Sequence, residues 1–255
     1  MRTVISDPDD PRVADYLHLT DPAPRMGFFI VEGWEAVVRL LRTDWPVRSV
    51  LIAADKVDRL EVPAGVPLYV APKEVLAATV GFQLHRGVVA AVDRRPVSAL
   101  ADLLSSSHTL AVLEGLNDHE NLGAIFRSAV VLGIDGVILD PTCADPFYRR
   151  CVRVSMGTVL TIPIARSEDW LSDLALMKQS GFTVVALTPH PAARDIGEVE
   201  VAGKPAVLLG SEATGLTTEA IAAADMMVRI PQSGDVDSLN VGHAAAIAFY
   251  RFGRR

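Results

Sequence analysis

The chain has 255 residues, of which half are hydrophobic and 22% are charged, so it can form one large or two smaller folded domains and is not expected to be disordered. Its net charge of −7 argues against a protein that wraps nucleic acid through overall positive charge. The start of the chain lacks the basic and apolar regions of a signal peptide, and no apolar run reaches the about 18 residues of a membrane span. We therefore expect a cytoplasmic protein without a membrane partner.

Cysteine spacing and local charge narrow the possible partners. Cys143 and Cys151 lie eight positions apart, which matches no zinc-binding or CxxC spacing, so we expect buried thiols and no metal site. Residues 1–100 hold 12 basic and 13 acidic side chains, and residues 101–255 hold 12 and 18. Any contact with RNA must therefore use local groups of arginines, such as Arg86, Arg94 and Arg95 or Arg149, Arg150 and Arg153.

The first 95 residues are expected to form a small α/β domain. Helical apolar spacing predicts helices over 34–41 and from Pro72 to about Val80. Short apolar runs predict strands over 27–31, 48–53, 68–70 and 87–92. Residues 96–107 contain a short helix between Arg94-Arg-Pro96 and the polar stretch Ser105-Ser-Ser-His108, and we expect them to link this domain to a second one over 108–255.

The second domain alternates strands and helices regularly, which predicts an α/β fold with a parallel sheet and helices on both of its faces. Apolar runs predict buried strands at 110–113, 136–139, 159–164, 183–187, 206–209 and 226–230. Helical stretches follow at 121–132, 146–156, 169–178, 217–224 and 238–249. Thr217 is expected to cap its helix.

Common nucleotide-binding motifs are absent from the sequence. Neither a GxxxxGK[ST] phosphate loop nor a GxGxxG turn occurs. An ordinary ATPase, kinase or Rossmann dehydrogenase therefore loses its main support. The same holds for the classical methyltransferase fold, which also uses a glycine-rich first turn.

Three short segments instead place polar or glycine residues where a strand passes into a helix. They are Asn121-Leu-Gly-Ala-Ile-Phe-Arg127, Leu209-Gly-Ser-Glu-Ala-Thr-Gly-Leu216 and Ile230-Pro-Gln-Ser-Gly-Asp-Val-Asp-Ser-Leu-Asn-Val241. Such junctions are where open α/β sheets bind ligands. Taken singly, each segment also has a plain structural interpretation as a helix cap, an exposed helix residue or a surface loop.

Chemistry-bearing residues can be assigned within each segment. Asn121 could cap the helix that begins there, and Arg127 near its start could offer a fork of donors to a phosphate. The two glycines of the second segment allow a ligand to approach the backbone closely, and Glu212 is the ionisable side chain of that turn. Ser238 stands where a helix N-cap belongs. Asn240 would then lie in the first turn, where asparagine is not favoured.

Together the segments resemble the three motifs of the SpoU/TrmH branch of the SPOUT RNA methyltransferases. The family pattern is Asn-Leu-Gly-…-Arg, then Gly-Ser-Glu-…-Gly, then Ile-Pro-…-Ser-Leu-Asn-Val before an alanine-rich helix. Arg153-Val-Ser-Met-Gly157 is similar to the region between the first two motifs. Residues 1–95 resemble the family's L30e-like RNA-binding domain through Val31-Glu-Gly-Trp34 and His85-Arg-Gly-Val88. Two departures are Gly242, where serine is usual, and Arg86, where glutamine is common.

The resemblance implies a fold and a reaction. The second domain would be a SPOUT domain with a deep trefoil knot, binding S-adenosylmethionine, and two copies would form a homodimer with shared active sites. The enzyme would transfer a methyl group to a ribose 2′-hydroxyl of RNA, with ribosomal RNA favoured over tRNA and no metal needed. A non-catalytic RNA-binding protein and a small-molecule methyltransferase remain alternatives, and an L30e-like first domain speaks against the latter.

The resemblance also assigns residues. The catalytic group would be Arg127 supported by Asn121, Glu212, Ser238 and Asn240. The cofactor would contact Leu209, Gly210, Gly215, Ile230, Ser238, Leu239 and Asn240. RNA would contact Arg86 and Arg127. Because a guanidinium stays protonated, Arg127 is better suited to anchor a phosphate or stabilise an alkoxide than to remove a proton.

Overall fold

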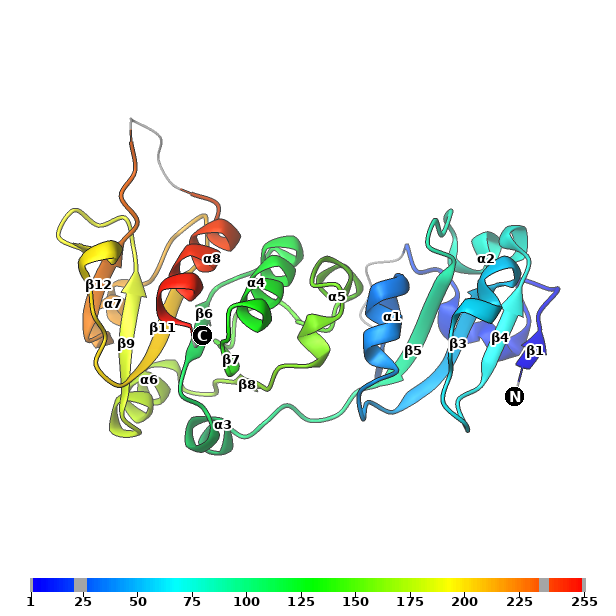
Figure 1. Cartoon of the computed structure of the whole chain (residues 1–255), viewed down its shortest axis with the longest axis horizontal. Coiled ribbons are helices and arrows are strands. Elements are labelled where there is room, and N and C mark those ends of the chain that lie inside the picture. Colours follow the sequence, from blue (N-terminus) through cyan, green and yellow to red (C-terminus); the bar gives the residue numbers. More distant parts are fainter. Residues whose placement is uncertain (1, 21–26, 234–238, 254–255) are drawn as a thin grey trace. The chain divides into compact units, whose positions relative to one another are not determined.

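The computed structural model describes residues 2–20, 27–233 and 239–253. The chain forms two compact units that do not follow the sequence continuously (Figure 1). Met1–Arg95 and Phe147–Thr161 make up the first unit, and Pro96–Pro146 and Ile162–Arg255 make up the second. No described helix is long and apolar enough to cross a membrane.

The first unit is built on a mixed sheet of five strands in the order β1-β4-β3-β5-β2, counted over the described residues. β2 and β3 are antiparallel to β5, and the remaining pairs are parallel. The strands are β1 (Arg2–Val4), β2 (Phe28–Glu32), β3 (Val47–Ala53), β4 (Leu68–Ala71) and β5 (Val88–Asp93). The helices are α1 (Trp34–Leu40) and α2 (Lys73–Val80), with the 3-10 helices η1 (Pro11–Tyr16) and η2 (Ala54–Arg59). The four strands and two helices predicted here are confirmed, whereas β1 and the two 3-10 helices were not foreseen.

Residues 147–161 pack against the first unit although they lie far along the chain. They form α5 (Arg149–Val154) and η3 (Thr158–Leu160), so the strand predicted over 159–164 is wrong and its pairing residues begin only at Ile164. The rings of Phe29, Trp45 and Phe147 cluster with centroids 5.2–5.3 Å apart. The Trp45 indole N–H donates to the Leu160 carbonyl at 3.0 Å. Apolar packing thus explains the hydrophobic run that imitates a strand.

Several arginines that could have offered an RNA-binding patch serve this packing. Arg149 and Arg153 both form ion pairs with Glu32, which is buried at the end of β2. Arg95 pairs with Asp44 at 2.9 Å and lies over the Trp45 ring. These three arginines therefore have acidic partners within the unit.

The second unit contains a sheet of seven strands, all parallel, in the order β10-β12-β9-β11-β6-β7-β8 over the described part of the chain. The strands are β6 (Leu110–Glu114), β7 (Gly136–Leu139), β8 (Ile164–Arg166), β9 (Phe182–Leu187), β10 (Arg194–Asp195), β11 (Lys204–Gly210) and β12 (Met226–Arg229). The helices are α3 (Leu100–Ser106), α4 (His119–Val131), α6 (Trp170–Gln179), α7 (Thr218–Ala223) and α8 (Val241–Phe252), with the 3-10 helix η4 (Ile196–Glu198).

Helices cover both faces of this sheet, as predicted. One core joins alternate strand residues such as Val112 and Leu208 to α3, α6 and α7. Because successive side chains of a strand point to opposite faces, the intervening residues face α4 and α8. These two helices lie side by side (Figure 1). A Cβ added at Gly242 in α8 would lie 3.2 Å from the Ala124 Cβ in α4, so the glycine permits this close approach.

The two cysteines are free and buried, as expected. Burial raises the pKa of the Cys143 thiol to about 12, so the thiol stays protonated at neutral pH. Its S–H also donates to the Leu113 carbonyl. Cys143 is therefore a packing residue and not a nucleophile.

Gly157→Ala should destabilise the first unit more than an ordinary substitution of a left-handed glycine. Gly157 has φ +76°, and a Cβ there would lie 2.9 Å from the Ala36 Cα. Gly65 has φ +92° with nothing within 4 Å of the added Cβ, so Gly65→Ala carries only the backbone cost of roughly 1–2 kcal/mol. We expect Gly157→Ala to lower the free energy of urea unfolding by about 1–3 kcal/mol more than Gly65→Ala does. Equal losses would show that α1 yields to the added methyl.

Candidate active site

The three segments singled out from the sequence meet at one edge of the parallel sheet. They follow β6, β11 and β12, and the carboxyl ends of parallel strands lie at the same edge. β11 pairs with β6 on one side and with β9 on the other, and β12 pairs with β9. The strand order therefore sets the second segment between the first and the third.

The first segment begins its helix earlier than predicted. Asp118 is the N-cap of α4, and its Oδ1 accepts from the backbone N–H groups of Glu120 and Asn121, both at 2.8 Å. Asn121 thus lies in the first turn, and its side chain is released from capping. Arg127 lies two turns into α4, not near its start, and is exposed. The sequence offered two suitable caps three residues apart, and spacing alone could not choose between them.

The N-cap predicted for the last helix is also wrong. Asn240 is the N-cap of α8, and its Oδ1 accepts from the N–H groups of Gly242 at 3.0 Å and His243 at 3.3 Å. Ser238 lies outside the described residues. Asparagine at position 240, which had no explanation as a first-turn residue, is therefore among the residues preferred at its actual position.

A hydrogen-bonded triangle joins one residue of each segment. The Asn121 Nδ2 donates to Glu212 Oε2 at 2.7 Å. The Asn240 Nδ2 donates to Glu212 Oε1 at 2.6 Å and to Asn121 Oδ1 at 2.8 Å. The backbone N–H of Val241 also donates to Glu212 Oε1 at 3.3 Å. Glu212 is thus the acceptor that connects the second loop to the starts of α4 and α8.

The second segment folds back on itself through its glycines. A Cβ at Gly210 would lie 2.3 Å from the backbone carbonyl carbon of Gly215, so glycine is required by the chain's own close approach. The Gly215 N–H donates to the Ser211 carbonyl at 2.9 Å, and Gly215 has φ +68°, which favours glycine. The Ser211 hydroxyl accepts from the Thr214 N–H at 3.2 Å. These glycines are therefore needed by the turn itself, besides any approach of a ligand to the backbone.

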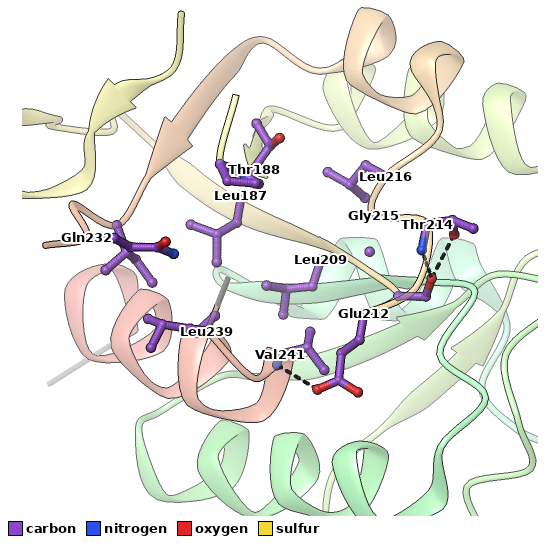
Figure 2. Close-up of a pocket in the computed structure, with 15 residues that line it drawn as sticks. Leu187, Thr188, Leu209, Glu212, Thr214, Gly215, Leu216, Gln232, Leu239 and Val241 are labelled. Carbon is purple, nitrogen blue, oxygen red and sulfur yellow. Dashed lines mark hydrogen bonds between the residues drawn. The ribbon is translucent and has the colours of Figure 1, made fainter. Parts of the chain in front are cut away.

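A cavity of about 370 Å³ lies beside this loop. It is lined by residues 187–189, 209–212, 214–216, 230, 232, 239, 241 and 244. The lining includes five residues expected to contact a cofactor, namely Leu209, Gly210, Gly215, Ile230 and Leu239. Figure 2 shows leucine side chains around the cavity and the Glu212 carboxylate at its side, next to Val241. Asn240 does not line it and belongs to the triangle instead.

The sequence did not indicate part of this lining. Leu187 ends β9, and Thr188 and Pro189 follow it. β9 lies between β11 and β12 in the sheet. Nothing but an apolar run marks β9 in the sequence, and strand order is invisible there. Gln232, by contrast, belongs to the third segment and could have been named (Figure 2).

Neither of the two arginines expected to contact RNA is among the residues that line the cavity. Arg127 is exposed on α4, and its side chain forms no hydrogen bond or ion pair with another described residue. Arg86 is exposed in the loop before β5 of the first unit, where the neighbouring His85 carbonyl accepts from Lys56 Nζ at 3.2 Å. Within the described residues, no three His, Cys, Asp or Glu side chains gather as a metal site would require.

Comparison with known proteins identifies the family. The family model described as the SpoU rRNA Methylase family matches residues 108–250. The uncharacterized tRNA/rRNA methyltransferase Rv0881 of Mycobacterium tuberculosis is 43% identical over 96% of this chain and 90% of its own length. The 23S rRNA (guanosine-2′-O-)-methyltransferase RlmB of Acinetobacter baylyi is 31% identical over 76% of this chain and 81% of its own length.

A solved structure extends the likeness to the fold. The AdoMet-bound rRNA methyltransferase from Sinorhizobium meliloti superposes with a TM-score of 0.84 at 28% identity, covering 98% of this chain and 97% of that one. Its match spans both compact units, and the family model covers more than half of the chain. The chain therefore belongs to the SpoU rRNA methylase family of SPOUT RNA methyltransferases.

Proposed function

We propose that this chain transfers a methyl group from S-adenosylmethionine to a ribose 2′-hydroxyl of RNA, with ribosomal RNA favoured over tRNA. The observation that carries the proposal is the cavity bordered by the triangle of Asn121, Glu212 and Asn240. Support for the cofactor comes from the AdoMet-bound relative, and support for the ribose oxygen and for ribosomal RNA comes from RlmB. The reaction would take place in the cytoplasm, where such RNA is found.

The cavity has properties that fit the cofactor. Its volume lies within the range of small-molecule sites, and its leucines suit an apolar, planar base such as adenine. Glu212 is the ionisable residue of the lining, and its carboxylate favours a nearby positive charge. S-adenosylmethionine supplies an activated methyl group on a cationic sulfonium. We assign its contacts to Leu209, Gly210, Gly215, Ile230 and Leu239, with Ser238 and Asn240 carried from the family motif.

The polar residues would act by holding the loops in place. The Glu212 carboxylate accepts from both asparagines, so it would hold the second loop against the starts of α4 and α8 before any substrate arrives. A ribose hydroxyl is a poor nucleophile, and its alignment with the methyl group is therefore a large part of the catalytic task. Arg127 would anchor a phosphate or stabilise the developing alkoxide through its guanidinium. The knot expected of the fold is part of the same proposal.

A homodimer would supply the second part of the site. α4 and α8 carry the exposed apolar residues Val131, Ile247 and Tyr250, with 72%, 41% and 62% of their surface accessible. These helices lie side by side, and a second copy could cover the apolar residues (Figure 1). Arg127 is on α4 as well and does not line the cavity of its own chain. We therefore propose that it serves the partner's site.

The first 95 residues would select the RNA, with Arg86 among the contacts. Arg86 is exposed, has no acidic partner among the described residues, and lies beside Lys56 and His85. A local group of cations can bind phosphate even though the whole chain is acidic. Residues 96–107 would then be the linker to the methyltransferase domain over 108–255.

Mapping 2′-O-methyl groups in total RNA tests the function directly. Cells without the gene should lack at least one ribose methyl group in ribosomal RNA. The loss is detected by alkaline cleavage, because a free 2′-hydroxyl attacks the adjacent phosphodiester and a methylated one cannot. The wild-type gene should restore the group, and Arg127→Ala should not. An unchanged ribose methylation map would overturn the proposal, and a lost group in tRNA would overturn the preference for ribosomal RNA.

Gly210→Val should abolish binding of S-adenosylmethionine by the full chain, measured by calorimetry. The valine side chain cannot fit against the backbone of Gly215 and Leu216, so the loop that lines the cavity must open. Gly203→Ala, just before the start of β11, is the control, since the nearest atom to its added Cβ is 3.7 Å away and only the backbone cost of its φ of +91° remains. Undiminished affinity of Gly210→Val for S-adenosylmethionine would contradict the assignment of the cofactor to this cavity.

Arg127→Ala should leave the affinity for S-adenosylmethionine nearly unchanged, because Arg127 does not line the cavity. Methyl transfer should fall by at least about a hundredfold, as expected for one preorganised charge-stabilising group. Arg127→Lys should recover little, since a point charge cannot replace the planar fork. A parallel loss of cofactor affinity would assign Arg127 to cofactor binding instead.

Mixed dimers separate action within one subunit from action across two. Arg127→Ala subunits combined with Gly210→Val subunits would produce one site with both defects and one intact site, if Arg127 acts on the partner's site. Activity should then partly return. Subunit exchange would be verified by mass spectrometry. Mixed dimers as inactive as the two single-variant homodimers would show that Arg127 acts in the site of its own subunit.

A further inference from the structure

Glu114 is a buried carboxylate beside the cavity loop that the proposed function does not use. It is the last residue of β6 and is only 5% exposed. Its backbone is the register partner of Gly210, where the second segment leaves β11. Glu114 neither lines the cavity nor belongs to the triangle of Asn121, Glu212 and Asn240.

Three neutral donors satisfy the Glu114 carboxylate. Its Oε1 accepts from the Trp170 indole N–H at 2.7 Å and from the Thr217 hydroxyl at 2.8 Å. Its Oε2 accepts from the Thr217 backbone N–H at 2.9 Å. Among the described residues, no lysine or arginine forms an ion pair with it. A buried charge without a counter-ion is costly, so these hydrogen bonds must compensate for its burial.

These contacts tie the cavity loop at both ends. At the start of the loop, Gly210 pairs with Glu114 in the ladder between β11 and β6. At its end, the Thr217 backbone N–H donates to the Glu114 carboxylate. Of the six residues between them, only Ala213 is absent from the cavity lining. Thr217 also starts α7, where its hydroxyl accepts from the Ala220 N–H at 3.2 Å. A shift of Thr217 would therefore move the cavity wall.

We infer that Glu114 is a positioning residue for cofactor binding, which acts through Thr217 on the loop over 211–216. The inference rests on the proposed function, since it assigns the cavity to S-adenosylmethionine. Glu114 touches neither reacting group. Its loss should therefore weaken cofactor binding and leave the chemical step, measured with saturating cofactor, nearly unchanged.

Glu114→Gln is the direct test. Glutamine has one acceptor oxygen, so it cannot accept from the Thr217 N–H and the Trp170 indole in the observed arrangement. The Kd for S-adenosylmethionine of the full chain, measured by calorimetry, should rise at least about fivefold because a buried donor is left unsatisfied. The KM for the cofactor should rise with it, while kcat stays within about twofold.

Two further substitutions separate positioning from general stability. Trp170→Phe removes a hydrogen bond to Glu114 that does not involve the loop, so it should lower Tm while leaving the Kd unchanged. Thr217→Ser retains both donors and should also leave the Kd unchanged. Thr217→Val removes the hydroxyl at an exposed site and should raise the Kd by about threefold. This last variant keeps the inference testable if Glu114→Gln does not fold.

The possible outcomes distinguish this inference from the proposed function. A wild-type chain that does not bind S-adenosylmethionine would end both. A wild-type chain that binds it, with a Kd that neither Glu114→Gln nor Thr217→Val changes, would overturn the inference alone. An equal rise in Kd for Trp170→Phe and Glu114→Gln would also overturn it, because the effect would then follow stability and not the position of the loop.

Discussion

The arrangement of the active site depends on one acceptor, the Glu212 carboxylate. Asn121 lies in the first turn of α4 and Asn240 caps α8, and both side chains donate to this carboxylate. Its loop leaves β11, which lies between the strands that deliver the other two segments. An exposed carboxylate contributes little through a single contact, but four hydrogen bonds connect the second loop to the starts of α4 and α8 and reinforce one another. Glu212 itself lines the cavity, so these bonds position part of the cavity wall.

Close approach of the backbone is the second constraint. The turn over 211–215 lies against Gly210 so tightly that no side chain fits there. Gly242 lets the start of α8 lie against Ala124 of α4, and the usual serine of the family would need a contact of 3.2 Å. Asn240 caps the turn in which Gly242 lies. Small residues at these positions thus bring three polar side chains within hydrogen-bonding distance.

The division into units shows how packing can override chain order. Residues 147–161 lie inside the span matched by the family model, yet they pack with the first 95 residues. The chain around this excursion is anchored by Arg166, whose guanidinium donates to the carbonyls of Asp140, Cys143 and Ala144. Apolar burial of Phe147 and Leu160, with the ion pairs of Glu32, stabilises the excursion. Residues of the methyltransferase sequence therefore contribute to the fold of the other unit.

The sequence by itself determined the period of most helices and strands, the parallel α/β class, and the three segments that carry the family resemblance. These are local signals, because apolar spacing and motif residues act over a few positions. It could not choose between Asp118 and Asn121 as caps, since both residue types bind free N–H groups equally well. Strand order decided which loops became neighbours, including the one after β9. Only the tertiary structure could unite Glu114 with Thr217 across 103 positions, because such contacts depend on packing that no local pattern records.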